Sequence, residues 1–281
     1  KEEYIARRMQ LPEANKHSLL TRAKRKIQLY YCNLIKTPSA FNKLRKHNIS
    51  QINRYSDNEL CVSERVKEIL TNAGVKKEIA EVNYIGTSVA EVCQYKGRTD
   101  IKTPFFTLLY MGYASSSKGF YFLLDALENM GSLKPGLCKN IIIKLASKIS
   151  DNLINQKLEK LKKCYHDIVV YNGYSHADFP IIMNNVNLGI VPPLWEDNLP
   201  QVAIEMIANG IPVMTSRNGG KHELNSGIDF SFSNQADFEK KIEKIYYNRD
   251  LLSDYWKNGS HLTTMEEHIN SLIKIYTGKI R

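Results

Sequence analysis

The stretch LWEDNLPQVAIEMIANGIPVMTS, residues 194–216, places three carboxylates around the start of an apolar helix. Glu196 and Asp197 precede the helix, and Glu205 lies on its second turn. A carboxylate beside apolar side chains must either reach solvent or accept hydrogen bonds. Two interpretations stay open: these acids contact a ligand, or Glu196 and Asp197 only favour the helix dipole while Glu205 points to water.

The ends of this helix are predicted from its prolines and its glycine. Pro200 fits the first helical turn, where a missing N–H is harmless, and Gly210 followed by Pro212 ends the helix. Asn198 and Leu199 then lie around the N-cap. The unpaired backbone amides of that region can hold an anion or a sugar hydroxyl.

A second loop, GYASSSKG at residues 112–119, combines glycines at both ends with Lys118 just before a helix. Its backbone amides and the lysine charge could cradle a phosphate. It is not a Walker loop, because G-x-x-x-x-G-K-[ST] is absent. The alternative is an ordinary strand-to-helix turn with a surface lysine.

A third loop, SRNGGKHE at residues 216–223, places Gly219 and Gly220 between a strand and a helix, which allows close backbone approach to a ligand. As a lone Gly-Gly turn it is unspecific. The seven histidines show no H-x-x-x-H or comparable pair, so we predict no metal site.

Short apolar runs alternate with helices from residue 105 onwards, and this alternation must position the loops. Strands are expected at residues 105–113, 140–146, 167–174, 186–193 and 211–216. Helices are expected at residues 119–130, 155–164, 177–185, 200–210 and 237–248. The pattern predicts an α/β fold with a Rossmann-like, doubly wound parallel sheet. In such sheets ligands bind beyond the carboxyl ends of the strands, where we expect residues 112–119, 171–176, 192–200 and 216–223.

The first part of the chain is predicted to be mostly helical. Residues 58–63 and 81–86 are expected to form short strands, and Ser63 is expected to cap a helix that stops at Gly74. Residues 87–103 are polar and of mixed charge, so we interpret them as a connecting segment.

Composition narrows the functional class. The 281 residues are 43% hydrophobic, and no apolar run approaches the ~18 residues of a membrane span, so we expect a cytosolic protein with a substantial core. Five scattered cysteines indicate neither a disulfide framework nor a zinc site. Because the chain begins with Lys1 in a charged helical stretch, we expect it to be a piece of a longer protein.

The formal charge is +10, and residues 1–60 contain 13 Lys or Arg against five acids. This excess favours a solvated helical face, or attraction to an anionic membrane surface or a phosphate-bearing substrate. Nucleic acid is a weaker hypothesis, because no basic stripe is interleaved with exposed aromatics.

Together, these stretches resemble the retaining glycosyltransferases of family 4, which have the GT-B fold of two facing Rossmann-like domains. Residues 108–130 (LLYMGYASSSKGFYFLLDALENM) are similar to the family's G-R-x(n)-K-G segment and its helix, and residues 169–224 are similar to its donor-site core. The resemblance spans about Asn58 to the C-terminus. It implies four parts: a partial acceptor-side domain at 1–83, a linker at 84–104, a nucleotide-sugar donor-binding domain at 105–262 and a C-terminal helix at 263–281.

The family's donor motif is E-x7-E, matched here by Asp197 and Glu205. The resemblance implies that Glu205 binds ribose hydroxyls and that Asp197 and Lys118 act at the reacting centre, with Lys118 neutralising the diphosphate. The other implied donor contacts are Gly112 in the phosphate loop, Gly173 and Tyr174 near the base, Asn198, Leu199 and Pro200 at the helix start, and Gly219 and Gly220 in the cleft wall.

The same resemblance implies the reaction and its partners. Retaining transfer needs a leaving diphosphate that is stabilised by cations and helix dipoles, without a cofactor or a required metal. The partners implied are a nucleotide-sugar donor and a glycan, phosphorylated or lipid-linked acceptor of polysaccharide biosynthesis. The basic N-terminal region would make peripheral contact with the cytoplasmic face of a membrane, and no nucleic acid is expected.

Two residues depart from the family pattern. Asp197 is one methylene shorter than the usual glutamate, with Glu196 beside it as a substitute, and Tyr113 replaces the arginine of the G-R pair. Only about 80 residues precede the linker, where the family has a full domain. Two alternatives therefore stay open: a non-catalytic nucleotide-sugar or partner-binding module, and a GT-B sugar-nucleotide epimerase.

Overall fold

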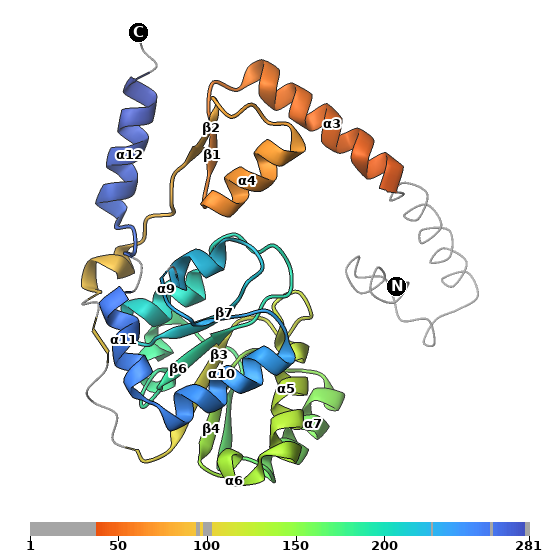
Figure 1. The fold of residues 1–281 in the computed structure, drawn as a ribbon, viewed down its shortest axis with the longest axis vertical. Helices are drawn as coiled ribbons and strands as arrows, with labels where there is room; N and C mark the ends of the chain where they lie inside the picture. Colours follow the sequence, from red (N-terminus) through yellow and green to blue (C-terminus); the bar gives the residue numbers. More distant parts are fainter. Residues whose placement is uncertain (1–37, 94–95, 98–102, 226, 259–260, 279–281) are drawn as a thin grey trace. The chain divides into compact units, whose positions relative to one another are not determined.

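The computed structural model describes residues 38–93, 96–97, 103–225, 227–258 and 261–278 (Figure 1). The basic residues before residue 38 and residues 94–95 and 98–102 of the expected linker lie outside the described part. The chain divides into two compact units, Lys1–Glu59 with Leu70–Ala80, and Leu60–Ile69 with Glu81–Arg281. Each is described by itself below.

The smaller unit contains the helix α3 (Pro38–Tyr55) and the last four residues of α4 (Glu64–Ala73). Gly74 ends α4 as predicted, and its φ of 112° is a left-handed conformation that glycine adopts without strain. Asn53 fixes this turn to α3, because its amide donates to the Gly74 carbonyl at 2.8 Å and accepts from the Lys76 N–H at 2.9 Å.

The larger unit is built on a six-stranded sheet with the order β5-β4-β3-β6-β7-β8, in which every pair is parallel. The strands are β3 (Phe106–Met111), β4 (Ile141–Ala146), β5 (Asp167–Tyr171), β6 (Leu188–Val191), β7 (Val213–Ser216) and β8 (Ser231–Phe232). All six residues of β3 are buried, as the uninterrupted apolar run predicts for a strand covered on both faces. The predicted doubly wound parallel sheet is therefore confirmed.

The helices of this unit cover both faces of the sheet. They are α5 (Phe120–Leu133), α6 (Pro135–Cys138), α7 (Asn152–Lys162), α8 (Phe179–Ile182), α9 (Gln201–Ala208), α10 (Gln235–Tyr247) and α11 (Asp250–Asn258). The last helix, α12 (Met265–Thr277), packs instead against the segment Ser88–Val92. Across the sheet, the step from β3 to β4 runs towards the β5 edge, whereas the step from β6 to β7 runs towards the β8 edge. Right-handed crossovers therefore place α5 and α9 on opposite faces, with α5 against α7 and α10 (Figure 1).

The boundaries of several elements differ from the prediction, and three of these differences bear on the site. The strand expected at 81–86 is limited to β2 (Ala80–Val82), which pairs with β1 (Glu59–Cys61). The connecting segment contains a 3-10 helix, η1 (Ser88–Val92), which packs on α9. Pro200 is the N-cap residue, so α9 begins one residue later than expected. No helix of the described residues is long and apolar enough to cross a membrane.

Candidate functional site

A cavity of about 600 Å³ lies at the carboxyl ends of β3, β4, β5 and β6, beside the point where the strand order reverses. We call it the strand-end cavity. It brings together four loops that are far apart in the sequence. The residues singled out above that line it are Gly112, Lys118, Gly173, Tyr174, Asp197, Asn198, Leu199 and Pro200. This is the position at which ligands bind in doubly wound sheets.

An ion pair between Lys118 and Asp197 joins two of these loops. The Lys118 Nζ lies 2.8 Å from Asp197 Oδ2 and 5.6 Å from the centre of the Trp195 ring. The Asp197 residue is only 9% exposed, so its carboxylate depends on this partner and on the Asn198 N–H, which donates to it at 3.1 Å. Gly119 brings the lysine loop close, because a Cβ at this position would lie 1.9 Å from the Pro192 carbonyl oxygen.

Glu196 points to a different partner. The Arg65 guanidinium binds it with two hydrogen bonds, Nε to Oε2 at 3.0 Å and Nη2 to Oε1 at 2.9 Å. The hydrogen bond from Arg65 lowers the pKa of the Glu196 carboxyl. Glu196 does not line the strand-end cavity, whereas Asp197 does. The geometry therefore favours Asp197 over Glu196 as the acid that faces a ligand.

The Gly219-Gly220 turn lies against the backbone of Asp197. Gly219 has a φ of 76°, and a Cβ there would lie 2.0 Å from the Asp197 carbonyl oxygen. The Gly220 N–H donates to that oxygen at 2.9 Å. The close approach that these glycines allow is thus to the protein's own backbone, and neither lines the strand-end cavity. The turn therefore supports the loop that carries Glu196 and Asp197, which we call the acidic loop.

Lys221, which the sequence reasoning did not single out, completes this support. It is fully buried, and its ammonium donates to the carbonyls of Asn218 and, at 3.3 Å, of Trp195. Burial lowers the pKa of Lys221 to about 8, although the nearby charges of Asp197 and Glu196 act in the opposite direction. Lysines are rarely buried, so only its position directly after two glycines could have indicated this role.

Glu205 lines a neighbouring cavity of about 610 Å³. Ile85 and Gln201 line both this Glu205 cavity and the strand-end cavity, so the two adjoin. The Glu205 side chain is 13% exposed, and its Oε1 lies 3.0 Å from Nε2 of the exposed His176. Tyr174 is close as well, because burial first and the Glu205 charge second raise the pKa of its hydroxyl. Glu205 therefore faces a cavity rather than bulk water.

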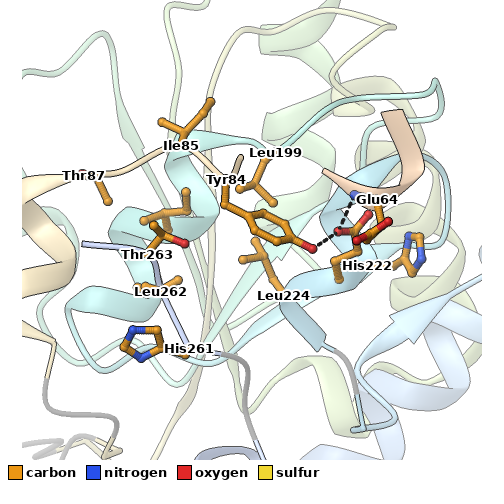
Figure 2. A pocket seen from close by; sticks show the side chains of 12 residues that line it. Glu64, Tyr84, Ile85, Thr87, Leu199, His222, Leu224, His261, Leu262 and Thr263 are labelled. Atoms are coloured by element: carbon orange, nitrogen blue, oxygen red, sulfur yellow. Dashed lines mark hydrogen bonds between the residues drawn. The ribbon is translucent and has the colours of Figure 1, made fainter. Parts of the chain in front are cut away.

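A third cavity, of about 400 Å³, surrounds the Tyr84 ring and shares Leu199 with the strand-end cavity (Figure 2). The Glu223 carboxylate accepts a hydrogen bond from the Tyr84 hydroxyl at 2.8 Å and from the backbone N–H of Glu64 at 3.1 Å (Figure 2). It also accepts one from the backbone N–H of Arg65 at 2.9 Å. Glu223 thus caps the start of α4, where Arg65 meets Glu196. No pattern in the sequence indicates that these residues pair.

The site is suited to a ligand with anionic and hydroxylated parts. Lys118, the start of α9 and Gly173 line the strand-end cavity, and a Cβ added at Gly173, where φ is 93°, would meet nothing within 4 Å. A second carboxylate, that of Glu205, lines the adjoining cavity. Across the part of the chain that the structure describes, no group of three or more His, Cys, Asp or Glu could hold a metal ion.

Comparison with known proteins shows which family this chain matches. The family model described as glycosyl transferases group 1 matches residues 106–248. A lipopolysaccharide 1,2-N-acetylglucosaminetransferase of Salmonella typhimurium is 30% identical over 121 residues, which is 42% of this chain, and the spore coat protein SA of Bacillus subtilis is 26% identical over 148 residues, which is 49% of it. These matches cover 32% and 38% of those proteins' own lengths, so they concern less than half of each.

Solved structures share the fold at low sequence identity. Anabaena Alr3699/HepE in complex with UDP has a TM-score of 0.68 and 18% identity, covering 87% of this chain and 70% of that one. The lipopolysaccharide outer core galactosyltransferase WaaB in its apo form has a TM-score of 0.62 and 16% identity, covering 81% and 63%. The chain thus has the α/β architecture of GT-B glycosyltransferases.

Proposed function

This chain belongs to the family of glycosyl transferases group 1, and from that premise we propose that it forms the donor-binding part of an enzyme that transfers a sugar from a nucleotide-sugar donor. The observation that carries the proposal is the Lys118–Asp197 pair in the strand-end cavity, with Glu205 in the adjoining cavity. That HepE was solved with UDP and with UDP-glucose supports a nucleotide sugar as the ligand class.

The donor would extend through both cavities. In this proposal the diphosphate lies at Lys118, the sugar beside Asp197, the ribose hydroxyls at Glu205 and the base near Tyr174. When the bond between the anomeric carbon and the diphosphate oxygen breaks, negative charge grows on the diphosphate, where Lys118 and the backbone amides at the start of α9 stabilise it. The Asp197 carboxylate stabilises positive charge that develops on the sugar.

The finer assignment is a family 4 enzyme that retains the anomeric configuration and needs neither cofactor nor metal. It rests on the match of Asp197 and Glu205 to the E-x7-E motif and on the order of the surrounding segments. The acceptor would be a glycan, or a phosphorylated or lipid-linked glycan, used in polysaccharide biosynthesis. The 13 Lys or Arg of residues 1–60 would hold the protein at the cytoplasmic face of a membrane.

The test is a transfer assay on the full-length protein. We expect label from one of the UDP, GDP, ADP or dTDP sugars to appear in an acceptor glycan, and NMR of the product to show the donor's anomeric configuration. Inverted product would contradict retention. An altered sugar nucleotide formed without acceptor would identify an epimerase instead.

A non-catalytic nucleotide-sugar-binding module is the second candidate, and Tyr113 is the observation that favours it. This side chain lines the strand-end cavity, is 77% exposed and brings no charge to a diphosphate. Donor binding without transfer or epimerisation by the intact protein would support this candidate.

A further inference from the structure

The charged residues that line the strand-end cavity differ in whether they form an ion pair. Its charged lining residues are Lys118, Asp197 and Lys148, which follows β4. Lys118 and Asp197 lie 2.8 Å apart, so their charges largely cancel at any distance longer than that. The net positive charge of the cavity lining is therefore that of Lys148.

The backbone of Lys148 is held at the strand ends. The Ser147 N–H donates to the Tyr171 carbonyl at 3.0 Å, and the Ile149 N–H donates to Asn172 Oδ1 at 2.9 Å. Residue 148 lies between these two anchors. Its four-carbon stem is flexible, so the ammonium can reach a ligand while the main chain stays in place.

Lys148 also lies beside the uncharged Tyr113. In the parallel pair of β3 and β4, Met111 is opposite Ala146, and Tyr113 and Lys148 each follow two residues later. Both side chains line the same cavity. A lysine on the β4 end thus occupies the same level of the cavity rim as the tyrosine on the β3 end.

The Lys148 ammonium is available to a ligand. Lys148 is exposed, and within the described residues its side chain makes neither an ion pair nor a hydrogen bond with the protein. Lysines that lie close to acids usually form ion pairs with them, as Lys118 does with Asp197. Lys148 has the charge, the position and the freedom to bind an anion.

We propose that Lys148 is the second cation of the diphosphate site and acts beside Lys118 from the neighbouring strand end. This inference rests on the proposed binding of a nucleotide sugar. When the diphosphate binds, Lys148 meets the oxygens that Lys118 alone leaves uncompensated, and thereby supplies the charge that Tyr113 lacks.

The test compares ligands with and without phosphate. The probe is whichever of UDP, GDP, ADP and dTDP binds the wild-type chain most tightly by calorimetry, together with the matching nucleoside. Lys148→Ala is expected to weaken diphosphate binding about tenfold, the usual size for a hydrogen bond to a charged group, and to leave nucleoside binding unchanged. Lys148→Arg should keep diphosphate affinity, and Tyr113→Arg should restore it in the Lys148→Ala background.

Lys163→Ala is the matched control, because it removes another exposed lysine, after α7, that lines neither the strand-end nor the Glu205 cavity. It should bind both ligands like the wild type. Equal diphosphate affinity of wild type and Lys148→Ala would overturn the role of Lys148, as would an equal loss for diphosphate and nucleoside. A wild-type chain that binds none of the four diphosphates contradicts the proposed function itself.

Discussion

Asp197 and Glu196 are adjacent acids with different environments. Asp197 is nearly buried and pairs with Lys118 inside the strand-end cavity, whereas Glu196 is held by Arg65 outside it. The spacing of the E-x7-E motif selects Asp197, and of the two acids only Asp197 lines the strand-end cavity. The chemistry at the reacting centre should therefore depend on Asp197, and Glu196 should act through the position of its loop.

Asp197→Asn should separate these roles. An amide cannot form the ion pair with Lys118 or stabilise positive charge on a sugar, so we expect kcat/KM of the intact protein for its nucleotide sugar to fall by about 100-fold or more. Glu196→Gln should lower it by less than about tenfold, because it weakens only a partly exposed ion pair. A larger loss in Glu196→Gln than in Asp197→Asn would reverse the assignment.

The buried Lys221 should make the free energy of unfolding depend on pH. Its pKa is about 8 in the folded chain and 10.5 in an unfolded one, so the unfolded state binds more protons between these values. The free-energy cost of burying the charged Lys221 ammonium is present in full below pH 8, and it disappears as the pH rises to 10.5. Relative to Lys221→Met, the wild type should gain up to about 3 kcal/mol of unfolding free energy across this range.

Urea unfolding of both proteins at pH 7 and pH 10 measures this difference, and the variant cancels the titration of all other groups. A stability difference that is the same at both values would show that the buried ammonium does not titrate as described.

At the residue scale, the sequence indicates the candidate residues that belong to a motif. It does not indicate residues whose role depends on a contact with a distant part of the chain. Lys118 and Glu205, which loop chemistry and the resemblance indicate, line the two adjoining cavities. The partner of Glu196 was not predicted, because Arg65 lies 131 positions away and nothing in either segment indicates the pairing. Lys221 was overlooked for a physical reason, since a lysine in a polar loop is ordinarily solvated.

At the scale of elements, the acidic loop between β6 and α9 is fixed from two sides. The Gly219-Gly220 turn supports it from behind, and the start of α4 holds Glu196 through Arg65. The strands and most helices were predictable because their apolar periodicity is long. The two-residue β8 was not, because its pairing with β7 rather than its own sequence makes it a strand.

Gly219→Ala tests the support behind Asp197. The added Cβ would lie 2.0 Å from the Asp197 carbonyl oxygen, in a backbone conformation with positive φ. We expect a loss of about 2–4 kcal/mol in unfolding free energy, together with weaker nucleotide binding as the loop moves. Gly136→Ala is the matched control, because a Cβ there meets nothing within 4 Å, and its stability should change by less than about 1 kcal/mol. Equal stabilities of the two variants would contradict the close packing of the turn.

At the scale of the whole molecule, the doubly wound sheet explains why the site lies where it does. The strand order reverses between β3 and β6, so the loops after these strands diverge and leave the strand-end cavity between them. This arrangement followed from the sequence, since alternating strands and helices admit few topologies. The cavity volumes and the division between the strand-end and Glu205 cavities did not, because they depend on how side chains pack.

The most direct test of the central claim is the melting temperature of this chain with UDP, GDP, ADP and dTDP. If the two adjoining cavities bind a nucleotide-sugar donor, one of these compounds at about 100 times its Kd should add about 2.7 kcal/mol and raise Tm by roughly 5 °C or more. Lys118→Ala should reduce this shift, and Glu205→Ala should abolish it while leaving the ligand-free Tm close to that of the wild type. No shift with any of the four, or an undiminished shift in Glu205→Ala, would contradict the assignment of the donor site.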